Sequence, residues 1–351
     1  MGEESRGSAM ATLSREKARL QATEPGATRR KSFWKLTNPY LYLLPAMAVM
    51  AVMTYYPMAY GIWMSFTDYG LKNLRVNSAA PDFVGLQNYI AILTNNVPQI
   101  ANFDFFYTLF FNLFWTFSNV IFHVVIGVLI AVLLNAKGLW FKGVYRAIFV
   151  LPIVIPTLVV ANVWRNMFDP DFGAINQFLA SMGGLIGISP ATFHIRWIES
   201  LNPPIPGIPL PLAYFALLIT NIWLGWPFMT IVATGALQSI SKDFYEAASI
   251  DGASPTQQFF SITLPLLRPA MVPAIIYGIT LTFNLFNLIY FVSGGGPLRE
   301  TEILVTTAFR LVNEQSLYGV AAAFAMYIAI ILLIITLVTN RISRATESYD
   351  V

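Results

Sequence analysis

Six long apolar stretches limit the structures open to this sequence to those that cross a lipid bilayer. A bilayer core of about 30 Å requires about 20 mostly apolar residues in a helix. Six stretches meet this requirement, at residues 40–66, 107–135, 144–168, 211–238, 269–292 and 317–340. They are too long for the strands of a membrane barrel, which take about 10 residues of alternating polarity. The sequence therefore predicts an all-α integral membrane protein with six transmembrane helices.

The composition agrees with this prediction and excludes several classes of protein. Only 11% of the 351 residues are charged, whereas soluble domains carry about 25%. The mean hydropathy is +0.61. Because the chain has no cysteine, it has no disulfide framework, thiol nucleophile or thiolate metal site. We identify no catalytic constellation and no metal site, and we expect neither an enzyme nor a nucleic-acid partner.

The distribution of Lys and Arg predicts the orientation of the six helices. Most of the 21 basic residues lie in segments that share one side of the membrane if the N-terminus is cytoplasmic. The positive-inside rule then places both termini in the cytoplasm. We expect a basic N-terminal segment (1–38), a permease domain (39–340) and a C-terminal tail (341–351). Residues 11–24 form either a basic amphipathic helix on the membrane surface or part of a tail that only fixes orientation.

Two long loops, 67–106 and 169–210, are then predicted to lie outside the cell. Residues 85–94 are typical of a short amphipathic helix, and the proline-rich segment 202–211 of an extended entry into the fourth span. Such loops serve either as a docking surface for an external partner or as a structural lid. Their composition does not separate these two functions.

The cytoplasmic loop between the fourth and fifth spans, residues 239–267, has an unusual composition. Residues 241–250 are predicted to form a short helix, with Ser241 at its start and Gly252 after its end. A second short helix is expected from Pro255 to about Ile262, before Pro265 turns the chain into the membrane. A helix of small residues with an acidic entry is suited to a groove in another protein rather than to lipid.

This loop resembles the EAA loop of ABC importer permeases. The residues that carry the resemblance are Glu246, Ala247, Ala248, Asp251, Gly252, Ile262, Leu264 and Pro265. Further matches are Tyr56-Pro57, Ser65-Phe66, Val84–Tyr89, Met167–Gly173 and Leu288–Pro297. Together they resemble the maltose-type (MalF-like) sugar permease subunits, and the resemblance implies the type I importer permease fold.

The resemblance also implies a function and a set of partners. In that family the loop helix couples the permease to a cytoplasmic ATPase, and this chain has no phosphate-binding loop of its own. The implied partners are a second homologous permease, two copies of the ATPase and an extracytoplasmic sugar-binding protein. We expect no cofactor in this chain, with ATP and Mg²⁺ bound by the ATPase, and a location in a prokaryotic cytoplasmic membrane. The implied substrate is maltose, maltodextrin, trehalose or a related oligosaccharide.

Polar residues within the fourth and fifth spans are the candidates for binding this substrate. Uncharged polar groups at membrane depth usually face a protein interior or an aqueous cavity. The candidates are Asn221, Gly225 and Phe228 in the fourth span and Tyr277, Thr280, Asn284 and Asn287 in the fifth. Their three- and four-residue steps place them on one face of each helix. Amides can bond sugar hydroxyls and aromatic rings can stack on the sugar, while glycine permits close approach.

Alternatives remain open for the residues and for the substrate. The polar residues would otherwise only bond neighbouring helices, and Thr282 and Leu285 stand where the resemblance would place polar amides. His123 is predicted to be an interhelical hydrogen bonder. Another sugar or a solute such as glycerol phosphate is the alternative substrate. An ion-coupled transporter would require acidic residues within the membrane, and the six predicted spans contain none.

Overall fold

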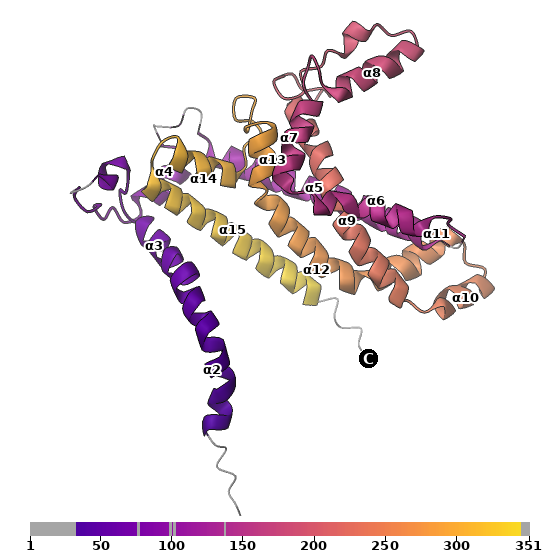
Figure 1. Ribbon diagram of the computed structural model, residues 1–351, viewed down its shortest axis with the longest axis horizontal. Coiled ribbons are helices and arrows are strands. Elements are labelled where there is room, and N and C mark those ends of the chain that lie inside the picture. Colours follow the sequence, from indigo (N-terminus) through magenta and orange to yellow (C-terminus); the bar gives the residue numbers. More distant parts are fainter. Residues whose placement is uncertain (1–32, 76–77, 98–99, 101–102, 137, 345–351) are drawn as a thin grey trace, which may run out of the picture. The chain divides into compact units, whose positions relative to one another are not determined.

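The computed structural model describes residues 33–75, 78–97, 100, 103–136 and 138–344, which form helices joined by loops (Figure 1). The predicted helix at 11–24 lies outside the described residues, as do most of the segment 1–38 and of the tail 341–351. The described chain divides into two compact units, one ending at Gly61 and the other beginning at Ile62. Among the described residues, five helices are long and apolar enough to cross a membrane, or six if one bent pair counts as a span. The predicted all-α membrane architecture is confirmed.

The first span is a continuous helical segment with a π-helical turn at its centre. It comprises α2 (Phe33–Met50), η1 (Ala51–Tyr55) and α3 (Tyr56–Met64). The N–H of Tyr56 bonds to the carbonyl of Ala51, five residues back. This wider turn stands directly before Pro57, whose ring would otherwise press on a carbonyl four residues back. The π-turn therefore allows the helix to continue through the proline.

The second unit is built around two tightly packed helices, α5 (Phe105–Asn135) and α9 (Leu212–Ser239). Gly127 of α5 lies against α9 so closely that an added Cβ would be 2.5 Å from the Cβ of Met229. The hydroxyl of Thr230 donates to the carbonyl of Gly127 at 3.1 Å. Two further helices, α12 (Leu264–Phe283) and α15 (Tyr318–Arg344), complete the bundle (Figure 1).

The third predicted span, 144–168, is not one straight helix. It consists of α6 (Lys142–Val154) and α7 (Thr157–Met167), which meet at an angle of 96°. The break follows from Pro156, because a residue before proline disfavours helical backbone. Ile155 accordingly has extended angles, φ −81° and ψ 127°. α6 packs on α9, whereas α7 packs on α13.

The fifth predicted span, 269–292, is also interrupted, and here the expectation of one continuous helix is wrong. α12 ends at Phe283 and α13 (Phe286–Val292) begins after a tight turn at Leu285. In this turn the N–H of Phe286 donates to the carbonyl of Asn284 at 2.7 Å, and Leu285 has the angles of an inverse γ-turn, φ −78° and ψ 64°.

A buried asparagine of α5 satisfies the backbone at this second break. The Nδ2 of Asn112 donates to the carbonyl of Phe283 at 3.2 Å. The Oδ1 of Asn112 accepts from the N–H of Leu304, the first residue of α14 (Leu304–Asn313), at 2.9 Å. One side chain therefore closes the end of α12 and the start of α14.

The loop after α9 contains the expected short helix, α10 (Lys242–Ile250). Ser241 caps its start by accepting from the N–H of Asp243, and Gly252 (φ +79°) follows its end. The second helix differs from the prediction, because Pro265 does not turn the chain. Instead, α11 (Pro255–Gln258), the π-helical η4 (Phe259–Thr263) and α12 form one helix, Pro255–Phe283. The N–H of Leu264 bonds to the carbonyl of Phe259, so that this π-turn accommodates Pro265 as η1 accommodates Pro57.

The remaining elements lie in the loops predicted to be external. They are η2 (Leu71–Leu74), α4 (Gln87–Leu93), α8 (Ala174–Leu185) and η3 (Pro190–Phe193). The short helix expected at 85–94 is present as α4. Residues 202–211 contain no helix, as expected. Near η2, the Lys72 ammonium hydrogen-bonds Asp68 and holds the pKa of that carboxyl below its usual value.

The segment from α13 to α14 contains a buried ion pair. The Oε1 of Glu302 lies 2.5 Å from the Nε of Arg310, without the geometry of a hydrogen bond. The hydroxyl of Thr307 donates to the other carboxylate oxygen at 3.2 Å. Burial raises the pKa of Glu302, and the positive charge of Arg310 opposes this shift. Arg310 also donates to the carbonyl of Gly294, so that the pair connects α14 to the end of α13.

Candidate functional site

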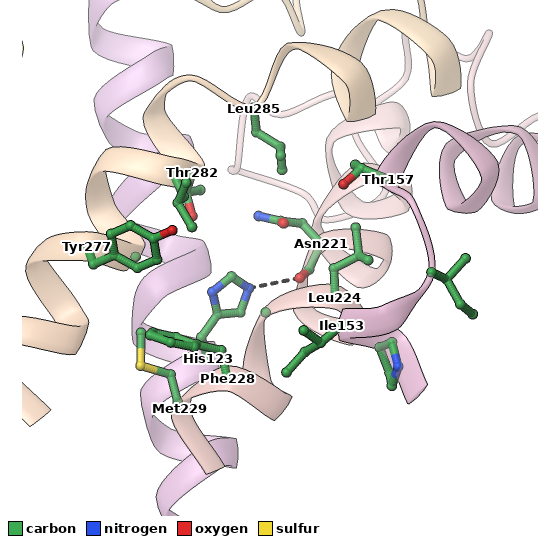
Figure 2. A pocket seen from close by; sticks show the side chains of 15 residues that line it. His123, Ile153, Thr157, Asn221, Leu224, Phe228, Met229, Tyr277, Thr282 and Leu285 are labelled. Carbon is green, nitrogen blue, oxygen red and sulfur yellow. Dashed lines mark hydrogen bonds between the residues drawn. The ribbon is translucent and has the colours of Figure 1, made fainter. Parts of the chain in front are cut away.

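A cavity lies where the two interrupted spans meet α5 and α9. Its volume is about 360 Å³. Figure 2 shows the side chains that line it. They are His123, Pro152, Ile153, Ile155, Thr157, Asn221, Leu224, Gly225, Phe228, Met229, Tyr277, Gly278, Leu281, Thr282 and Leu285. Irregular backbone at membrane depth is tolerated where it is buried in protein or lines a cavity, and both breaks line this one.

Asn221 is the polar side chain best placed to bind a ligand in this cavity. Asn221 is only 3% exposed, and its Nδ2 has no hydrogen-bond partner in the described part of the chain. The amide nitrogen extends from α9 into the space facing Thr282 of α12 (Figure 2). A buried amide without a partner costs free energy, about 1–3 kcal/mol. A ligand with a hydrogen-bond acceptor would remove this cost.

His123 and Gly225 fit together beneath the cavity. The Nε2 of His123 lies 2.9 Å from the backbone carbonyl of Asn221, so His123 bonds α5 to α9, as predicted. A Cβ on Gly225 would lie 2.1 Å from the Cε1 of this imidazole. The space predicted beside Gly225 for a sugar is therefore occupied, because the imidazole of His123 lies next to its Cα.

The substitution Gly225→Ala should therefore weaken the packing of α5 on α9. The new methyl group overlaps a rigid ring, and overpacking of this kind costs about 1–3 kcal/mol. We expect a lower midpoint of thermal unfolding for the purified protein. The double variant Gly225→Ala, His123→Ala should recover part of this loss, because it removes the overlapping ring. An equal loss in both variants would contradict the proposed contact.

The structure brings four of the seven predicted substrate residues to the cavity. Asn221, Gly225, Phe228 and Tyr277 line it, and the rings of Phe228 and Tyr277 lie 5.6 Å apart. The other three do not line it. Thr280 lies on a different side of α12 from the lining residues Gly278, Leu281 and Thr282, and α12 ends at Phe283, before Asn284 and Asn287.

Each of these three side chains lies elsewhere. The Thr280 hydroxyl donates to the carbonyl of Ile276 within α12. The Nδ2 of Asn284, the residue directly after α12, donates to the carbonyl of Thr280. Asn287 is exposed on α13. In their place the breaks contribute Ile153, Thr157, Thr282 and Leu285. Pro156 was a signal for the first break, but no comparable signal marks the second.

The residues of the predicted coupling loop extend from α10, through the turn after it and η4, to the start of α12. Glu246, Ala247, Asp251, Gly252, Leu264 and Pro265 are exposed, and Ala248 and Ile262 are half-buried. Two large apolar side chains of α10 are also exposed, Phe244 (55%) and Ile250 (87%). The hydroxyls of Tyr245 and Thr263 lie 3.0 Å apart and bond α10 to the helix that follows. The loop therefore holds a fixed shape while presenting apolar side chains.

Comparison with known proteins identifies the family. Residues 123–348, which include the cavity and the loop, match the family described as "Binding-protein-dependent transport system inner membrane component". The chain belongs to this family. It is thus a multi-pass membrane component of a transport system, as the sequence predicted.

Its relatives include several permeases named for sugars. The chain is 32% identical over 305 residues to the trehalose/maltose transport system permease protein MalF of Thermococcus litoralis, covering 87% of this chain and 93% of that protein. It is 32% identical to the galactooligosaccharides transport system permease protein GanP of Bacillus subtilis, covering 85% and 68%. Among solved structures, a bacterial ABC transporter that imports alginate matches with a TM-score of 0.70 at 22% identity, covering 89% of this chain and 98% of that one. This match confirms the predicted importer permease fold.

Proposed function

We propose that this protein is a permease subunit of an ATP-driven importer and that its cavity carries a neutral sugar, such as maltose, a maltodextrin, trehalose or a related oligosaccharide. The names of its relatives support a sugar, and the chemistry of the cavity carries the proposal. Its lining contains no carboxylate, ammonium or guanidinium group. A phosphorylated solute such as glycerol phosphate would have no counter-charge there.

The lining suits the two surfaces of a sugar ring. The Nδ2 of Asn221 and the hydroxyls of Thr157 and Thr282 can bond to sugar hydroxyls, while Phe228 and Tyr277 offer aromatic faces to its C–H surface. A cavity of about 360 Å³ is within the range of small-molecule sites, about 300–1,000 Å³. An oligosaccharide would extend beyond it into the part of the pathway supplied by a second permease subunit.

We further infer that α10 is the coupling helix. Its exposed Phe244 and Ile250, on a loop held by the Tyr245–Thr263 hydrogen bond, are suited to a groove of a cytoplasmic ATPase. Two ATPase copies would bind ATP and Mg²⁺, and an external sugar-binding protein would deliver the substrate. The basic residues predict that both termini are cytoplasmic. Nucleotide binding would supply the difference in free energy that moves the permease between its inward- and outward-open states.

Purification in mild detergent from the native membrane, followed by mass spectrometry, tests this assembly. We expect an ATPase and a second six-span permease to remain bound. Recovery of the chain alone would contradict the assembly. The purified complex is then tested with its binding protein against maltose, trehalose, maltodextrin and glycerol phosphate. Stimulation of ATP hydrolysis by the phosphorylated compound alone would contradict the neutral-sugar proposal.

The substitution Asn221→Ala should raise the sugar concentration required for half-maximal uptake by about tenfold. It removes a donor to a sugar hydroxyl, and such a bond contributes about 1–1.5 kcal/mol. The matched control is Asn284→Ala, because Asn284 lies outside the cavity and bonds its own helix. Uptake by both variants is measured over a range of sugar concentrations. Equal effects at the two positions would exclude a specific role for Asn221.

A further inference from the structure

A second cavity lies between α5, α6 and α9, at the end of the bundle where α9 leads into α10. Its volume is about 190 Å³, and it shares no lining residue with the first cavity. It is lined by Leu134, Arg146, Phe149, Val150, Pro227, Thr230, Ile231 and Thr234. The family match and the proposed transport cycle assign it no role.

Arg146 is the one charged residue of this lining. Its Nε is shielded from solvent and has no hydrogen-bond partner among the described residues. It also forms no ion pair within that part of the chain. Arg146 belongs to α6, the first half of an interrupted span, where an unpaired guanidinium is costly. Intramembrane arginines usually find an anionic partner, and no acidic residue lines this cavity.

The walls of the cavity favour an amphipathic anion over a small soluble one. Leu134, Phe149, Val150 and Ile231 are apolar, and Ile231 is also exposed on the outer surface of α9. The hydroxyl of Thr230 already donates to backbone carbonyls. A ligand would thus meet one cationic group, the hydroxyl of Thr234 and otherwise mostly apolar surroundings. A phosphate attached to hydrocarbon chains has this chemistry.

The segment just before α6 places this cavity near the surface of the bilayer. Trp140 and Phe141 are 81% and 72% exposed, and exposed aromatic residues at the end of a span are typical of the headgroup region. Lys142 follows at once, and Arg146 lies one helical turn further along the same face. The rise of about 6 Å over these four residues keeps the long Arg146 side chain within reach of the lipid phosphates.

We propose that this cavity binds an anionic phospholipid, with the lipid phosphate on Arg146 and Lys142 and an acyl chain along Leu134 and Ile231. Basic pockets between transmembrane helices are known to receive anionic headgroups. The bound lipid would fill the space between α6 and α9 and neutralise the half-buried guanidinium of Arg146. Because α9 leads directly into α10, the site stands beside the loop that we assign to coupling.

Native mass spectrometry of the purified protein, with whatever subunits remain bound, tests the site. The protein is incubated with mixed micelles of phosphatidylglycerol and phosphatidylcholine. We expect selective retention of phosphatidylglycerol, and a reduction of about tenfold in Arg146→Gln, the loss expected for a charge-assisted hydrogen bond. Arg146→Lys should retain part of the binding. The matched control Arg341→Gln removes an arginine at the end of α15, outside the cavity, and should bind normally.

Several outcomes would overturn the proposal. These are equal retention of the two lipids, unchanged retention in Arg146→Gln, or displacement of the lipid by inorganic phosphate, which would indicate a site for a soluble anion. If Arg146→Gln fails to fold, a photoreactive phosphatidylglycerol is cross-linked to the unsubstituted protein. Cross-links to α6 and α9 support the site, and cross-links only elsewhere refute it. Neither readout requires transport, so the sugar proposal is tested separately.

Discussion

Replacing Gly252 with valine should abolish most sugar uptake while leaving the protein inserted and folded. Gly252 ends α10 with φ +79°, a conformation that is strained for a β-branched residue. The N–H of Gly252 bonds to the carbonyl of Ser249, and that of Ala253 to the carbonyl of Ala248. These two bonds form a Schellman motif that fixes the direction of the chain after α10. If this direction positions α10 in the ATPase, we expect uptake to fall by tenfold or more, the equivalent of about 1.4 kcal/mol.

The chain offers a closely matched control at Gly187. This glycine ends α8 with φ +78°, and its N–H and that of Ile188 form the same pair of hydrogen bonds, to Gly184 and Gly183. An added side chain would meet no atom within 4 Å at either glycine. Gly187→Val therefore introduces similar strain in the loop predicted to be external. We expect nearly normal uptake in this variant. Uptake and ATP hydrolysis are measured in vesicles for both variants. Equal losses of uptake would show that backbone strain alone causes the effect.

The substitution Asn112→Leu should destabilise the protein strongly. The leucine would leave the carbonyl of Phe283 and the N–H of Leu304 without their partner inside the protein. Each buried polar group left unpaired costs about 1–3 kcal/mol. This cost for each group exceeds the roughly 0.6 kcal/mol that is typical of a hydrogen bond between membrane helices. It is larger because backbone groups at a helix break have no partner within a helix. We expect the midpoint of thermal unfolding to fall by about 5 °C or more.

Asn119, two turns further along α5, provides the control for this substitution. It is equally buried, but its Nδ2 donates to the carbonyl of Trp115 in its own helix and its Oδ1 has no partner among the described residues. Asn119→Leu removes an unsatisfied oxygen and should change the stability by less than about 1 kcal/mol. A similar fall in both variants would show that Asn112 acts through packing rather than through the two backbone bonds.

Sequence patterns predicted the elements whose causes are local. The spans predicted at 107–135 and 211–238 are α5 (Phe105–Asn135) and α9 (Leu212–Ser239), because hydrophobic length alone defines them. The cap at Ser241 and the glycine after α10 were also predicted, since both act within a few residues of the helix end.

The interruptions of the third and fifth spans depend on more distant contacts. Pro156 is a local signal for a bend, but the 96° angle accompanies the packing of α7 on α13, far along the chain. The turn at Leu285 has no breaker residue, and its freed carbonyl at Phe283 is bonded by Asn112 of α5. The prediction extended one helix past Phe283. It therefore placed Asn287 on the same helix face as Tyr277, whereas Asn287 lies on α13.

The interrupted spans also have a consequence for the order in which this protein is assembled during synthesis. α7 has 11 residues and α13 has 7, so their helical lengths are only about 16 and 10 Å, short of the bilayer core. The insertion machinery would nevertheless meet residues 144–168 as one largely apolar segment with an arginine near each end. At that moment α13, more than one hundred residues later in the chain, has not yet been made. Pro156 can bend the third span from the start, but the packing of α7 on α13 can form only after the fifth span has been made.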